Sequence, residues 1–307
     1  MSKIPLIVIA GATASGKTAL AVELALRLGG EVVSADSMQI YREISVGTAK
    51  PDTAEMRGVP HHMLDFLPPE ENYSVAEYVN AAHGVIAGIC ARGRTAVVAG
   101  GTGLYIDSLV RDVDFDGEDA PDIRAALEER ARREGAQALL AELAEFDSVS
   151  AQRLHLNNLK RIIRAIEFYR LHGVPISEHQ ERTRQKDSRY RAIYMMIDRP
   201  RAELYERINL RVELMMENGL LEEARALYEK RDALGKTAAQ AIGYKELFAY
   251  FDGGTTLADA VEEIKLQSRQ YAKRQLTWFR RNPDMHLLSP GNAADEAETL
   301  ARKFLSE

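Results

Sequence analysis

The stretch LIVIAGATASGKT, at residues 6–18, decides the fold of this chain. Residues 6–10 form a continuous apolar run rich in β-branched side chains, which is typical of a strand buried on both faces. The glycine loop GATASGKT follows at residues 11–18, and a helical pattern of leucines follows the loop. Strand, loop and helix stand in the order that a phosphate-binding P-loop requires.

The chemistry of this loop predicts a bound diphosphate or triphosphate. Its backbone N–H groups and the positive end of the following helix would converge on phosphate oxygens. Lys17 would reach the terminal phosphate, and the Thr18 hydroxyl would hold Mg²⁺. A chance glycine turn before a helix is the alternative, but it leaves the preceding strand unexplained. The loop does not say which phosphate compound is bound.

Composition indicates a globular protein with a core domain and an appendage. The chain has 307 residues, of which 46% are hydrophobic and 28% are charged. Its single cysteine, Cys90, excludes an internal disulfide and a CxxC zinc site, and it fits a reducing cytoplasm. No apolar run approaches the roughly 20 residues that span a bilayer, and the early first strand leaves no room for a signal peptide. We therefore expect a cytoplasmic protein, with monomer as the default state.

Further polar residues follow the ends of two more predicted strands. Asp36 follows the strand pattern at residues 31–35, and the sequence GGTG at residues 100–103 follows the one at residues 95–99. Ligands of parallel α/β sheets collect beyond the carboxyl ends of the strands, so Asp36 is expected near the P-loop. Many P-loop ATPases carry an acidic residue where this chain has GGTG. The small residues there favour close approach of a second substrate over nucleotide hydrolysis.

The character of the chain changes at residues 115–190, where helical patterns replace strand patterns. Residues 153–191 contain ten Lys or Arg against four Asp or Glu, although the whole chain has a net charge of −6. A solvated helix face is one interpretation of such an excess. A surface for a polyanion is the other, because the positive charge is gathered in one helical insertion. We predict a P-loop NTPase-like parallel core, at residues 1–114 and 191–307, with this all-helical insertion at 115–190.

The second part of the core returns to strand and then to helix. A strand pattern covers residues 191–198, and a long helical stretch covers residues 201–231. Arg207 and Arg211 share a face of that stretch, either for a ligand or for pairing with nearby glutamates on the surface. The last long helix, at residues 256–281, carries a basic stripe with interleaved aromatic residues, a pattern that can grip nucleic acid. The stripe consists of Lys265, Arg269 and Lys273.

Taken together, the motifs resemble those of the tRNA dimethylallyltransferases. The resemblance covers residues 5 to about 282 in family order. It is carried by GATASGKT (11–18), DSMQIY (36–41), GTAKP (47–51), PHH (60–62), GGTGLY (100–105) and RQLTW (274–278). One departure is Ala12, where the family loop has proline, and the zinc finger of eukaryotic relatives is absent.

The resemblance implies dimethylallyl diphosphate rather than ATP in the P-loop, with Mg²⁺ on Thr18. The acceptor is N6 of the adenosine at position 37, next to the anticodon, in tRNAs that read codons beginning with U. The diphosphate-binding residues implied are Gly11, Ala12, Thr13, Ala14, Ser15, Gly16, Lys17 and Thr18. Those implied for tRNA are Asp36, Ser37, Met38, Gln39, Thr102, Arg124, Lys160, Arg161 and Arg164. The catalytic residues implied are Asp36, Thr102 and Arg211, with Arg207 as the alternative arginine.

The role of Asp36 has three possible interpretations at this stage. It could accept the proton of the adenine amine, hold the metal, or only position the adenine. Two other classes of function also share the first motif. A small-molecule kinase is disfavoured by the residues after Asp36 and by GGTG, and a GTPase-like switch lacks a guanine-reading motif. A transferase that prenylates free AMP is a closer rival, and the basic insertion favours tRNA over it.

Overall fold

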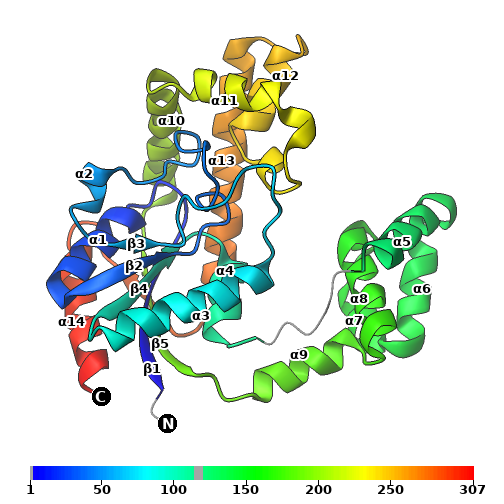
Figure 1. The fold of residues 1–307 in the computed structure, drawn as a ribbon, viewed down its shortest axis with the longest axis horizontal. Helices are drawn as coiled ribbons and strands as arrows, with labels where there is room; N and C mark the ends of the chain where they lie inside the picture. The colour runs from blue at the N-terminus through cyan, green and yellow to red at the C-terminus, as the bar shows by residue number, and fades with distance from the viewer. Residues whose placement is uncertain (1–2, 114–119) are drawn as a thin grey trace. The chain divides into compact units, whose positions relative to one another are not determined.

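The computed structural model describes residues 3–113 and 120–307, and it confirms the predicted parallel α/β core. Six parallel strands form one sheet in the order β3-β2-β4-β1-β5-β6 (Figure 1). Their bounds are β1 Ile4–Ala10, β2 Gly30–Ser34, β3 His61–His62, β4 Thr95–Gly100, β5 Tyr190–Ile197 and β6 Met285–Leu288. The apolar run of β1 lies in the middle of this sheet and is buried from Leu6 onward, as its sequence predicts.

Helices cover the sheet and extend beyond the carboxyl ends of its strands (Figure 1). The helices next to the sheet are α1 Lys17–Leu28, α2 Thr53–Met56, α3 Val75–Ala91, α4 Gly103–Val110 and α14 Ala293–Ser306. A capping box begins α3, with the Ser74 hydroxyl accepting from the Glu77 N–H. The helices beyond the strand ends are α10 Arg201–Glu217, α11 Leu220–Glu229, α12 Tyr244–Phe251 and α13 Leu257–Phe279.

The helical stretch predicted at residues 201–231 consists of two helices, α10 and α11. The break falls at Gly219, which adopts a left-handed conformation with φ of 94°. A separate apolar cluster joins α11, α12 and α13 to the loop that follows β2, with Tyr41, Leu220 and Tyr244 among its most buried members. This cluster fixes the loop at residues 40–46 against the helices.

Residues Arg111–Ser188 form a second compact unit, separate from the unit of Met1–Val110 and Arg189–Glu307. Its described residues are helical and contain no strand. The elements are α5 Pro121–Glu134, α6 Ala136–Phe146, α7 Ser148–Arg153, a 3-10 turn at Leu156–Asn158, α8 Leu159–His172 and α9 Ile176–Gln185. Leu127, Leu139 and Ile162 belong to a core of its own. Within the described parts of both units, no helix is long and apolar enough to cross a membrane.

Candidate active site

The P-loop joins β1 to α1 and is largely buried. Lys17 bends back over the loop, and its ammonium group lies 3.4 Å from the carbonyl oxygen of Ala12. Burial lowers the pKa of Lys17 to about 8; the Asp36 carboxylate opposes this effect and the Arg211 guanidinium adds to it. The terminal amine is therefore held between an acid and a second cation, at the place where a diphosphate would supply the missing negative charge.

Three arginines on α10 or just before it donate hydrogen bonds to the P-loop. Arg207 Nε donates to the carbonyl oxygen of Ala14 at 2.9 Å, and Arg199 Nε donates to that of Ser15 at 2.7 Å. Arg211 Nη1 donates to the Thr13 hydroxyl at 3.2 Å. Arg207 and Arg211 thus bond to the P-loop rather than to the nearby glutamates, although Arg207 is exposed as the surface alternative predicted.

Asp36 and Thr102 meet where β2 and β4 end side by side. The Thr102 hydroxyl accepts from the Ser37 N–H at 3.0 Å, and the Thr102 N–H donates to the Ala35 carbonyl at 3.1 Å. One oxygen of the Asp36 carboxylate accepts from the N–H of Met38 at 3.0 Å. The carboxylate is thereby fixed in direction while its second oxygen is left for a ligand.

Gln275 on α13 is a site residue to which sequence reasoning gave no role. Its side-chain oxygen accepts from the Thr13 N–H, and its side-chain nitrogen donates to the Gly101 carbonyl, both at 2.9 Å. A Cβ on residue 101 would lie 2.1 Å from the Gln275 nitrogen, so a larger residue there would displace the Gln275 amide. One buried amide therefore ties the P-loop to the GGTG loop. Its only sequence signal is its place in the RQLTW motif.

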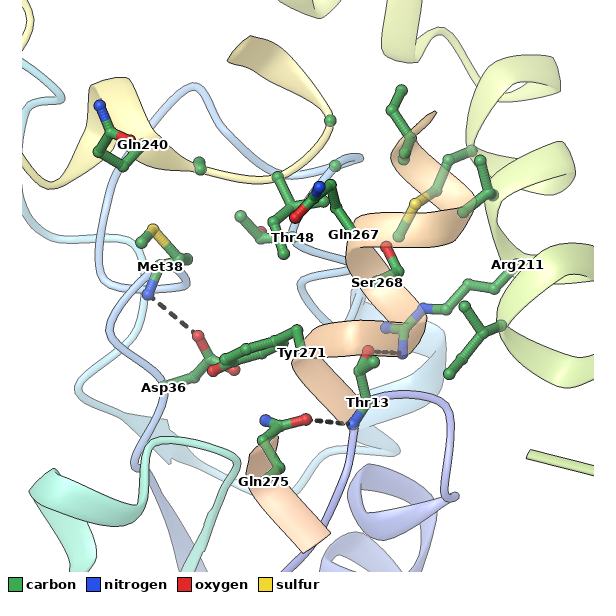
Figure 2. A pocket seen from close by; sticks show the side chains of 18 of the residues that line it. Thr13, Asp36, Met38, Thr48, Arg211, Gln240, Gln267, Ser268, Tyr271 and Gln275 are labelled. Atoms are coloured by element: carbon green, nitrogen blue, oxygen red, sulfur yellow. Dashed lines mark hydrogen bonds between the residues drawn. The ribbon is translucent and has the colours of Figure 1, made fainter. Parts of the chain in front are cut away.

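These elements enclose a cavity of about 290 Å³, seen in Figure 2. Thr13 and Arg211 lie on one side of it, and Asp36 lies across from Arg211 beside Tyr271. Lys17 also belongs to the lining. Burial, together with the nearby Asp36 charge, raises the pKa of Tyr271 well above its usual range, so Tyr271 stays protonated. The apolar lining comes from Met38, Ile208, Val212, Met215, Ala241, Ile242 and Ile264.

A second, more open cavity lies on the outer side of the P-loop. Its cationic lining consists of Lys17, Lys50, Arg207 and Arg211. Lys17, Arg211 and Met215 line both cavities and so stand between them. This position exposes the same two cations to both cavities.

Other residues singled out in the sequence make contacts within the protein. The Gln39 amide donates to the carbonyl oxygens of Thr48 and Ala49, at 3.1 and 3.2 Å, so both its donors serve the loop. In the basic stripe of α13, Lys265 pairs with Glu213 and Arg269 bonds to Asn209, both on α10. These contacts fix α13 to α10.

The histidine pair and the helical unit complete the survey of sequence-predicted residues. His62 Nε2 lies 2.7 Å from the buried Glu31 carboxylate, and no group of three possible metal ligands from His, Cys, Asp or Glu occurs among the described residues. In the helical unit, Lys160 and Arg161 are exposed on α8. Arg124 and Arg164 instead bond to the fully buried carboxylate of Glu167, at 2.9 and 3.1 Å.

Comparison with known proteins identifies the family of this chain. Residues 39–282 match the family described as IPP transferase, and residues 4–71 match the one described as isopentenyl transferase. The tRNA dimethylallyltransferase of Bacillus subtilis (strain 168) is 46% identical over 282 residues, which cover 91% of this chain and 88% of that protein. The one of Geobacillus kaustophilus (strain HTA426) is 46% identical over 301 residues, which cover 96% and 94%.

Solved structures agree as well. The full-length tRNA isopentenylpyrophosphate transferase of Bacillus halodurans has a TM-score of 0.73 at 39% identity, covering 99% of this chain and 98% of that one. A eukaryotic dimethylallyltransferase acting on tRNA has a TM-score of 0.87 at 28% identity, covering 99% and 80%. With the P-loop, Asp36 and Thr102 assembled as described, these matches show that the chain belongs to the tRNA dimethylallyltransferase family.

Proposed function

We propose that this protein transfers a dimethylallyl group from dimethylallyl diphosphate to N6 of adenosine 37 in tRNAs that read codons beginning with U. One observation carries the proposal: Lys17 and Arg211 line the same cavity as Asp36. A diphosphate leaving group needs the cations, and an amine nucleophile needs a proton acceptor. No nucleotide-hydrolysing carboxylate stands at the GGTG loop, where many ATPases carry one.

In the reaction, the bond between C1 of the prenyl group and the diphosphate oxygen breaks while N6 bonds to C1. Negative charge builds on the departing diphosphate, where the loop N–H groups, Lys17 and Arg211 stabilise it. The adenine amine is a weak nucleophile, and Asp36 accepts its proton as the new bond forms. Thr102 holds the Ser37 backbone and thereby the loop that carries Asp36.

Mg²⁺ is the metal that we propose for the diphosphate. Thr18, Asp36, Ser34 and Gln39 offer oxygen donors to a small pocket that Lys17 and His61 also line. Oxygen donors suit Mg²⁺, which binds through one or two protein ligands and substrate phosphates. When bound, the ion would neutralise charge on the diphosphate, with Thr18 as its protein ligand.

We assign the tRNA to the helical unit and to the rim of the cavity. Lys160 and Arg161 are exposed on α8 and present two adjacent positive charges to a phosphate backbone. The target base must leave the anticodon stem-loop stack to reach the cavity. Ser37, Met38, Gln39, Arg124 and Arg164 remain predicted tRNA contacts. We expect a monomer, in the cytoplasm where tRNA is found.

Transfer of radiolabel tests the proposal. The protein is incubated with labelled dimethylallyl diphosphate and Mg²⁺, and separately with undermodified tRNA, with free AMP and with fully modified tRNA. We expect label in the undermodified tRNA alone. Label in AMP, or release of diphosphate without transfer, would refute the assignment of tRNA as the acceptor.

A further inference from the structure

The loop of residues 44–50 forms part of the walls of both cavities. Gly47 and Thr48 line the inner cavity, while Ala49 and Lys50 line the outer one. Ala49 has a φ of 44°, a left-handed conformation that costs energy for a residue with a Cβ atom. Such a conformation persists only where surrounding contacts stabilise it. The conformation of the loop therefore depends on its contacts with other parts of the protein.

A carboxylate from α11 grips the loop. Glu223 accepts from three successive backbone N–H groups, those of Ser45, Val46 and Gly47, at distances from 2.8 to 3.1 Å. Three N–H groups in a row form a cradle that ordinarily suits an anion such as phosphate. In this protein, the Glu223 side chain fills the cradle, although Glu223 lies more than 170 residues away in the sequence.

Tyr244, at the start of α12, completes the grip. Its hydroxyl donates to the Glu223 carboxylate and accepts from the Gly47 N–H at 3.1 Å. The ring is buried and lies so close to the loop that a Cβ on residue 47 would be 2.7 Å from it. Gly47 belongs to the GTAKP motif, and Tyr244 belongs to the segment AIGYKE at residues 241–246. The hydrogen bond between Gly47 and Tyr244 therefore brings these two segments together.

The far end of the same loop touches the reaction centre. The carbonyl oxygen of Ala49 accepts from the Gln39 amide at 3.2 Å and faces Arg211 Nη2 at 3.5 Å. Movement of the loop would therefore move the partner of Arg211, whose guanidinium lines both cavities. A misplacement of about 1 Å at such a group can cost a factor of about 100 in rate.

We propose that Glu223 and Tyr244 are positioning residues for prenyl transfer, acting through residues 45–49 on Arg211 and the cavity walls. The proposal rests on the proposed function for its kinetic consequence. Its structural consequence, that Glu223 holds the loop, stands apart from any activity. The two are measured separately.

The first measurement is amide hydrogen exchange of the peptide that spans residues 44–50. Glu223→Gln keeps the size of the side chain but places an amide nitrogen against N–H donors. Glu222→Gln, the exposed neighbour on the same helix, is the matched control. We expect exchange of this peptide to rise about tenfold or more in Glu223→Gln and to stay unchanged in Glu222→Gln. Unchanged exchange in both variants would overturn the proposal.

The second measurement is the single-turnover rate of label transfer with both substrates saturating. We expect the rate to fall about tenfold in Glu223→Gln and in Tyr244→Phe, with dissociation constants for donor and tRNA changed less than about threefold. The double variant should lose little more than either single one, because both act on one loop. If the transfer rate of each variant fell only in proportion to the fraction of protein that is folded, the kinetic role would be overturned.

Chemical rescue separates positioning from general damage. Glu223→Ala leaves the N–H cradle empty, and acetate should restore its rate and loop protection, while acetamide or equal ionic strength from chloride should not. Equal effects of acetate and acetamide would contradict an anion role for Glu223. A wild-type protein that transfers no label would refute the proposed function, and the exchange result would still decide whether Glu223 holds the loop.

Discussion

At the scale of single residues, the site depends on a lysine whose charge is finely balanced. Lys17 is half-buried and feels the charges of Asp36 and Arg211, and the loss of solvent brings its pKa down to about 8. In the free protein, the protonated fraction of Lys17 therefore decreases as the pH rises through the range just above neutral. A bound diphosphate would favour the protonated form, so binding and protonation are coupled.

The affinity for dimethylallyl diphosphate in the absence of tRNA should consequently depend on pH. Below pH 8 Lys17 is already protonated, and above it binding requires uptake of a proton. We expect the dissociation constant to rise up to about tenfold per pH unit above 8. Titration calorimetry from pH 7 to 9.5 measures this, and Lys17→Arg should remove the slope because arginine stays charged. A flat profile for the wild type would be inconsistent with the lowered pKa.

At the scale of elements, α10 brings two arginines to the P-loop for different tasks. Arg207 supports the backbone of the loop through the Ala14 carbonyl, whereas Arg211 reaches the cavity itself. They lie one turn apart on the same helix face, so their effects can be compared on a common background.

Alanine at these two positions should separate rate from binding. Arg211→Ala removes a cation from the departing diphosphate and should lower the single-turnover rate by about 10²–10³, by analogy with loss of one oxyanion donor. Arg207→Ala should mainly weaken donor binding. Full turnover in Arg211→Ala with loss in Arg207→Ala would show that Arg207 is the catalytic arginine.

Elements with a local signal could be predicted from the sequence. The strand, P-loop and α1 follow from periodicity and glycine spacing, and the α3 cap follows from Ser74 and Glu77. The break between α10 and α11 was missed, because a left-handed Gly219 leaves the helical pattern of neighbouring residues intact. The contact of Gln275 with Thr13 spans 262 positions, so no local pattern reports it. The hydrogen bonds of Glu223 to residues 45–47 likewise span more than 170 positions, so no local pattern predicts them.

At the scale of the whole molecule, positive charge is concentrated in one segment, residues 153–191, where ten Lys or Arg stand against four Asp or Glu. The chain is acidic overall, while exposed Lys160 and Arg161 lie on α8 of the helical unit. The basic excess was evident in the sequence, but the roles of its members were not. Arg124 and Arg164 contact the buried Glu167 carboxylate, so reversing their charge would damage the fold as well as the surface.

The salt dependence of tRNA binding tests the helical unit. Reversal of charge in a double variant, Lys160→Glu with Arg161→Glu, should weaken binding and reduce the slope of log affinity against log salt by about 1 to 2. The control is Arg132→Glu with Arg133→Glu, which changes the same charge on exposed positions of α5. Equal reductions in both double variants would argue for a diffuse attraction, and no reduction in the first would remove the unit as the tRNA surface.

The proton transfer to Asp36 is the central claim of this account. Asp36→Asn keeps the acceptor for the Met38 N–H but removes the capacity to take a proton. Its single-turnover transfer rate, measured with saturating tRNA and donor over a range of Mg²⁺ concentrations, tests the claim most directly. The account predicts a fall of about 10²–10⁴ in rate that Mg²⁺ does not reverse, with tRNA affinity nearly unchanged. Recovery of the rate at high Mg²⁺, or a matching loss of tRNA affinity, would contradict it.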